Sequence, residues 1–185
     1  STPHTSNIMG MIIASTGSFF DAGDLTIVGT YQNGVSSPTR GIIFGGATPS
    51  GAYRNIDAFT MASGGNATKF GDLSAARQYV DTSSNTIRGL SAGGSPSTNL
   101  IEFVTIATEG NAQDFGDLHS ATTTGKNGSV SSATRGIFSG FYPAQTARMD
   151  FVTIMSAGNA QDFGDMTATW YYHGGCSDSN GGIGE

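Results

Sequence analysis

The amino-acid sequence repeats itself, and the length of the repeat constrains the fold more than any other feature. The octapeptide GNAQDFGD occurs twice without change, at residues 110–117 and 158–165. The end of this motif, with the residue after it, recurs as AGDL, FGDL, FGDL and FGDM, and the four motifs end 48, 45 and 48 residues apart, at Leu25, Leu73, Leu118 and Met166. Four copies in a fixed order indicate a repeat protein with one supersecondary unit per copy.

Each unit contains several short apolar segments separated by turn residues. Runs such as IEFVTI and MDFVTI precede the FGDL-type motifs, and a second marker, SSPTRG, SSNTIRG or SSATRG, carries Arg40, Arg88 and Arg135. Short apolar segments between Gly, Ser, Asn and Pro are typical of strands joined by tight turns. Four strands fit each unit of about 48 residues, which is typical of a propeller blade. The sequence therefore predicts an all-β fold, a β-propeller of four-stranded blades with about four blades' worth of chain.

The repeat also predicts where the blades begin and end. Three whole units cover roughly residues 26–73, 74–118 and 119–166, and residues 167–185 together with 1–25 make up a fourth. Two arrangements follow from this phase. Either the two ends pair and close a four-bladed ring, or the chain is a slice of a larger ring. The second is favoured, because the chain ends within a predicted strand.

Composition supports the all-β prediction and excludes some functions. Gly accounts for 28 of 185 residues and charged residues for only 12%, a balance that fits a turn-rich β protein rather than a disordered chain. The net charge is −6 and no basic cluster occurs, so we expect no nucleic-acid partner. No apolar run approaches the roughly 20 residues of a membrane helix, so we expect no membrane insertion.

Each unit contains a further ordered set of motifs. An apolar run that ends in a Gly pair (IIFGG, residues 42–46) is followed by a strand with an acidic residue and then by FGDLSAAR at residues 70–77. In this order the unit resembles the kelch repeat. The usual Trp of the last kelch strand is Phe in this chain, at Phe70, Phe115 and Phe163. The recurring sequence motifs TRG, GNA and FGDL are also similar to repeats in structural proteins of tailed bacteriophages, especially marine ones.

These resemblances imply a non-catalytic propeller that serves as a binding or structural module. They imply a phage virion appendage or surface protein that contacts a host receptor or neighbouring subunits, by self-assembly or with other virion proteins. The expected location is then the virion or the extracellular space. A carbohydrate-binding, lectin-like propeller for a host surface glycan is the first alternative. A kelch-type oxidase or another propeller enzyme is the second.

The repeated arginines each have an acidic residue downstream in the same unit. We expect an antiparallel hairpin to pair Arg40 with Asp57, Arg88 with Glu102 and Arg135 with Asp150. One Arg–carboxylate bridge per blade is a structural interpretation, since a guanidinium suits a paired carboxylate. The functional alternative is a ring of cations that holds an anionic ligand.

The DFGD motifs at residues 114–117 and 162–165 place two carboxylates three positions apart. Calcium loops need several oxygen ligands at alternate positions, and the second unit carries Lys69 where the others have the first Asp. We therefore expect a turn in which Asp caps its own backbone and Gly takes a positive φ, and no metal site.

The remaining candidates for chemistry are few. The histidines His4, His119 and His173 have no metal-binding spacing, and Cys176 is the only cysteine, so no intrachain disulfide can form. The kelch resemblance includes copper oxidases with Tyr, His and Cys ligands, which would implicate Cys176, His173 and the tyrosines at 171 and 172. These residues lie on one segment rather than on converging blades. The sequence therefore predicts no catalytic residue and no cofactor.

The loops after the Gly pair vary from unit to unit, as in ATPSGAYRN, SPSTN and FYPAQTAR. Propellers recognise ligands with such loops, and aromatic residues there suit sugars or protein surfaces. Packing between blades is the alternative role for each residue. The candidate binding residues are Tyr53, Arg54, Phe141, Tyr142, Trp170, Tyr171, Tyr172 and His173.

Overall fold

The computed structural model describes residues 5–122, 128–142, 146–170 and 173–177. All regular elements in these segments are β-strands, which confirms the all-β prediction. No helix with the length and apolar character of a membrane span occurs in the described residues.

The strands form four antiparallel sheets that follow one another along the chain. The first sheet pairs β1 (Thr5–Gly10) with β2 (Phe20–Gly29). The second contains β3 (Asn33–Ser36), β4 (Arg40–Thr48), β5 (Gly51–Thr60) and β6 (Thr68–Asp72). The third contains β7 (Asp81–Ser84), β8 (Arg88–Ala92), β9 (Thr98–Thr105) and β10 (Gln113–Thr122). The fourth contains β11 (Val130–Ser131), β12 (Arg135–Ser139), β13 (Arg148–Thr153) and β14 (Gln161–Asp165).

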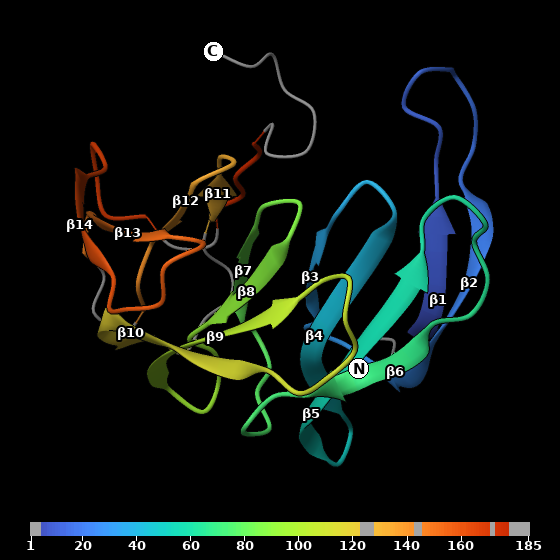
Figure 1. Ribbon diagram of the computed structural model, residues 1–185, viewed down its shortest axis with the longest axis horizontal. Helices are drawn as coiled ribbons and strands as arrows, with labels where there is room; N and C mark the ends of the chain where they lie inside the picture. The colour runs from blue at the N-terminus through green and yellow to red at the C-terminus, as the bar shows by residue number, and fades with distance from the viewer. Residues whose placement is uncertain (1–4, 123–127, 143–145, 171–172, 178–185) are drawn as a thin grey trace.

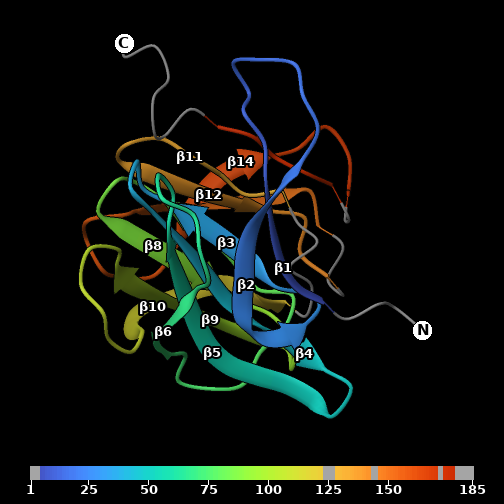
Figure 2. The same cartoon turned by 90° about the vertical axis from the view of Figure 1, so that its right-hand side faces the viewer.

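The sheets stand side by side in chain order, from β1–β2 at one end to β11–β14 at the other (Figure 1). The first strand of each large sheet faces the next sheet: β3 contacts β7, and β7 contacts β11 and β12. Figure 2 looks at the β1–β2 hairpin from outside and shows that it covers the second sheet, with its loop projecting beyond the others. Repeated four-stranded sheets in this order are compatible with a propeller, and the described residues form no closed ring.

The hydrophobic core lies between the sheets. One buried cluster joins the second and third sheets and includes Phe44, Ile56 and Val104; another joins the third and fourth and includes Leu90 and Phe138. Alternate residues of a strand point to opposite faces, so each large sheet presents an apolar face to its neighbour. Each sheet therefore buries its apolar surface only through the adjoining repeat, as expected of a repeat protein.

Neighbouring sheets are also joined by a loop of one repeat that lies along the edge strand of the repeat before it. Between the second and third sheets, Gly110 N–H donates to the carbonyl of Phe70 at 3.0 Å, and Ala112 N–H to that of Asp72 at 2.9 Å. In return Asp72 N–H donates to Oδ1 of Asn111 at 3.0 Å. These three hydrogen bonds extend the edge strand by a short piece of the next repeat.

The other two interfaces repeat this pattern. Residues 65–67 lie on residues 22–24, and residues 158–160 lie on residues 115–117, with the same two backbone bonds and the same bond to an Asn side chain. A Cβ on Gly116 would overlap the backbone of the Gly158 loop, so the edge strand needs glycine there. The octapeptide GNAQDFGD therefore carries both sides of the interface: GNA inserts into the preceding repeat, and FGD receives the next one.

Candidate functional site

The three acidic residues of the third strands are buried, and each accepts a backbone hydrogen bond from the preceding sheet. Asp57, Glu102 and Asp150 are 4%, 1% and 0% exposed. Their carboxylates accept the N–H groups of Thr26 at 2.8 Å, Ser74 at 2.9 Å and His119 at 2.9 Å. Each of these donors directly follows the last residue of an FGDL-type motif. The acids are therefore a second repeated contact between sheets, because each satisfies a backbone donor of its neighbour.

Each carboxylate has a further donor, and its source differs between repeats. Asn55 Nδ2 donates to Asp57 Oδ1 at 2.6 Å, and Arg148 Nε donates to Asp150 Oδ1, also at 2.6 Å. Both donors lie two residues before their acid, on the same face of the strand. The third sheet has Leu100 at this position, and its acid is the longer Glu102, which instead reaches a cation in the segment between β6 and β7.

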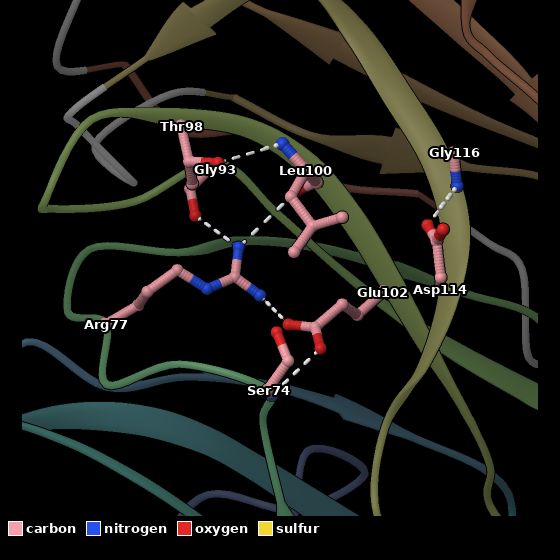
Figure 3. A network of polar contacts seen from close by, with 8 residues as sticks. All are labelled: Ser74, Arg77, Gly93, Thr98, Leu100, Glu102, Asp114 and Gly116. Carbon is pink, nitrogen blue, oxygen red and sulfur yellow. Dashed lines mark hydrogen bonds and ion pairs between the residues drawn. The ribbon is translucent and has the colours of Figure 1, made fainter.

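That cation is Arg77, the centre of the buried network in Figure 3. Its Nη2 donates to Glu102, and its Nη1 donates to the carbonyl oxygens of Gly93 at 2.7 Å and Leu100 at 3.4 Å. Both side chains of the ion pair are 2% exposed. Burial lowers the pKa of Arg77, and the charge of Glu102 opposes this shift. The pair is enclosed between two sheets, so its geometry fits a structural role.

The predicted Arg–acid ladder does not form. Arg40 lies opposite Thr60, Arg88 opposite Thr105 and Arg135 opposite Thr153, each three positions from the expected acid. The prediction was wrong because the third strand continues three residues past each acid, which shifts the pairing. An offset of three also places the Arg and the acid on opposite faces of the sheet.

Two of these arginines instead contact the next repeat. Arg40 Nη1 donates to the carbonyl of Ile106 and Arg88 Nη1 to that of Ile154, both at 3.1 Å. Arg88 and Arg135 also stack on rings of the adjacent third strands, 4.4 Å and 4.9 Å from the ring centroids. Arg135 is exposed, and no carbonyl partner lies among the described residues. The alternative of a cation ring is not supported for Arg40 and Arg88, because both are engaged between sheets.

Two of the candidate binding residues are packing residues. Phe141 is 2% exposed and belongs to the core between the third and fourth sheets. Tyr53 is half-buried, and its hydroxyl accepts a hydrogen bond from Gln32 Nε2 at 2.8 Å. Burial raises the pKa of Tyr53, the Gln32 bond opposes the shift, and the charge of Asp57 adds to it.

Other candidates remain accessible. Arg54 is exposed, Trp170 is 59% exposed, and Tyr142 is half-buried. Tyr171 and Tyr172 lie outside the described residues. His173 is wedged beside the backbone of Gly140, with Nε2 3.1 Å from Ser139 Oγ.

The DFGD motif forms a bulge within the edge strand rather than a turn between strands. The register of β10 on β9 shifts between Asp114 and Gly116, and Asp114 Oδ1 accepts the N–H of Gly116 at 3.0 Å. The fourth sheet repeats this cap, from Gly164 N–H to Asp162 Oδ1 at 2.9 Å. The expected positive φ of the glycine is confirmed, at 141° for Gly116 and 130° for Gly164. The expected turn at the Gly-Asp pair was wrong, because the cap is made by the first Asp of the motif within a bulged strand.

The described residues contain no group of three or more His, Cys, Asp or Glu side chains that would hold a metal ion. His4 lies outside them, and Cys176 is exposed with a free thiol.

Sequence reasoning missed the asparagines of the GNA loops, Asn66, Asn111 and Asn159. They receive the edge-strand N–H at each interface. Their signal was present in the doubled octapeptide, which preserves Asn at the same place in both copies.

Comparison with known proteins adds no family: no protein-family model matches the chain, and no curated protein matches it.

Proposed function

We propose that this chain is a non-catalytic binding and structural module, built as part of a kelch-type β-propeller. One observation carries the proposal. The residues that repeat from unit to unit make contacts between sheets, whereas Arg54 and Trp170, which do not repeat, are exposed. A scaffold with constant joints and variable loops is an arrangement for recognition.

The acidic residues argue against a catalytic role. Asp57, Glu102 and Asp150 are buried and accept backbone N–H groups of the preceding sheet. A general acid or base must come within hydrogen-bond reach of its substrate. These carboxylates are at most 4% exposed and accept backbone N–H groups, so in this proposal they serve the framework.

The variable loops provide the binding surface in this proposal. The β4–β5 hairpin extends to Thr48 and Gly51 and carries the exposed Arg54 nearby, and the segment after β14 carries the exposed Trp170. A solvent-exposed indole offers a flat apolar face for a sugar ring or a protein side chain. Loops of different length change this surface from repeat to repeat, while the contacts between sheets stay the same.

The biological setting that we propose is a bacteriophage virion appendage or surface protein, located in the virion or the extracellular space. Its partners there are a host receptor or neighbouring subunits. This setting is supported by the resemblance of the TRG, GNA and FGDL motifs to repeats in phage structural proteins. A carbohydrate-binding propeller is the second candidate, and the exposed Trp170 favours it.

The test measures binding by the purified chain to a glycan array and to bacterial surface polysaccharides. We expect a ligand whose affinity falls about tenfold or more in Trp170→Ala, since such a loss is typical of an aromatic anchor. Met155→Ala is the matched control, because Met155 is 47% exposed and lies in the turn after β13. Equal losses in both variants, or turnover of a bound ligand, would refute the proposal. Crosslinking in native particles tests whether the chain contacts neighbouring subunits, as the proposal also allows.

A further inference from the structure

The edge strand of the fourth sheet carries the same receiving motif as the other edges, but none of the described segments lies on it. Phe163, Gly164 and Asp165 of β14 form this motif, called here the β14 edge. A Cβ on Gly164 would meet nothing within 4 Å, whereas one on Gly116 would meet the backbone of Gly158. Phe163 is 44% exposed, while its equivalent Phe115 is 2% exposed. The β14 edge therefore has the form of an occupied edge without its occupant.

Arg135 gives an independent indication at the same end of the molecule. Its equivalents Arg40 and Arg88 each donate to a carbonyl in the following repeat. Arg135 stacks on Phe151 at 4.9 Å and reaches no carbonyl within the described part of the chain. An open hollow of about 600 Å³ lies beside it, lined by residues of the β11–β12 hairpin together with Cys176 and Ser177 of the C-terminal segment. Both the backbone edge and the cation that join other repeats are thus available at this face.

We propose that the β14 edge is a docking site for a further repeat of the same construction. The occupant carries a Gly-Asn-Ala loop and an acidic residue on its third strand. Its loop N–H groups donate to the carbonyls of Phe163 and Asp165, and its Asn accepts the N–H of Asp165. Arg135 donates to a carbonyl at the end of its third strand. This geometry continues the three interfaces that the chain already contains, and the inference does not depend on the proposed function.

The first repeat of this chain does not match that description. Its sequence GSFFDAGD aligns with GNAQDFGD, so Ser18 stands in place of Asn and Phe19 in place of Ala. The equivalent Ala67 is buried at 8% exposure, a position that a Phe side chain would overfill. Ile8 pairs with Gly23 as Ile56 pairs with Gly71, which places Met9 where the other repeats have the acid. The occupant is therefore a different repeat, not the first repeat of this or a second copy.

The experiment uses a full-length probe with a corrected first repeat and a blocked edge. The probe carries Met9→Asp, Ser18→Asn, Phe19→Ala and Phe163→Asp. All four positions are exposed, so we expect the fold to persist. The first three changes supply the inserting face, and the fourth prevents the probe from binding itself. The probe is mixed with the wild-type chain, and the mass of the complex is measured by sedimentation velocity.

We expect a one-to-one complex of probe and wild-type chain. Phe163→Asp in the wild-type partner should abolish it, and Arg135→Ala should weaken it about tenfold or more, as for a central interface residue. Met155→Asp is the matched control and should leave it unchanged. A probe without Met9→Asp should bind more weakly with the same dependence on Phe163.

Three results would overturn the proposal. One is the absence of a complex when circular dichroism shows both proteins folded. Another is a complex that survives Phe163→Asp in the partner. The third is self-association of the wild-type chain that Phe163→Asp removes, because the chain's own first repeat would then be the occupant.

Discussion

The buried Arg77–Glu102 pair allows a quantitative test of how the sheets are joined. Replacing Arg77 by Met keeps most of the apolar volume but removes hydrogen bonds to the Gly93 carbonyl, the Leu100 carbonyl and Glu102. Glu102 then still accepts the backbone N–H of Ser74, but it is 1% exposed and has lost its cationic partner. Breaking a buried ion pair by removing one partner costs about 3–5 kcal/mol.

We therefore expect Arg77→Met to lower the free energy of unfolding by about 3–5 kcal/mol, about a fifth or more of the stability of an ordinary domain. The assay is urea unfolding followed by far-ultraviolet circular dichroism. Lys69→Met is the control, because Lys69 is 57% exposed and its bridge to Asp72, at 3.0 Å, lies on the surface. Exposed pairs contribute about 0–1 kcal/mol.

A double-mutant cycle with Glu102→Gln separates the pair from the other contacts. Glu102→Gln removes the charge but leaves an acceptor for Ser74 N–H, so the double variant should be more stable than the sum of the single losses predicts. A loss of less than about 1 kcal/mol for Arg77→Met would refute the reasoning, because it would place the pair among surface bridges.

Three further predictions concern single positions. Gly116→Ala and Gly164→Ala both place alanine at a positive φ, of 141° and 130°, so their strain is matched; Gly116→Ala should cost about 1–3 kcal/mol more in urea unfolding, because only there does the next loop occupy the space. Asn111→Ala should cost about 1 kcal/mol in the same assay, since it removes the acceptor of an edge-strand N–H. Burial raises the pKa of Tyr53, so the stability that this neutral phenol contributes is present below about pH 10 and is lost as pH rises through its folded pKa. Above pH 10 the free energy of unfolding of Tyr53→Phe should therefore fall less steeply with rising pH than that of the wild type. Urea unfolding at several alkaline pH values measures both slopes, and equal slopes would contradict this prediction.

The fold was predictable because the repeat spacing places equivalent strands at the same positions in each unit. The spacing of the FGDL-type motifs and the apolar runs between turn residues predicted short strands, and sheets of four strands are observed. Neither inference required knowledge of long-range contacts, because each unit gives the same answer as the others. Closure of the sheets into a ring, and the number of blades, remain predictions.

The side-chain contacts were less predictable. Charge alone predicts the pairing of Arg40 with Asp57, but the carboxylate accepts the backbone N–H of Thr26. A backbone donor leaves no mark in the sequence, so a partner search among charged residues selects the wrong group. Phe141 shows the same limit, since an aromatic residue after a Gly pair is compatible with a binding loop and with the core where it lies.

The interfaces have a consequence for assembly that follows from their direction. Each joins the GNA loop of one repeat to the FGD edge of the one before it, so the two sides of the contact are different surfaces. Such a head-to-tail contact ends only when the series closes into a ring or when a terminal repeat departs from the pattern. The first repeat departs from this pattern at Met9, Ser18 and Phe19, so we expect its own inserting face to bind an FGD edge weakly. The fourth repeat keeps Phe163, Gly164 and Asp165 unchanged, so we expect its edge to accept a GNA loop as the other edges do.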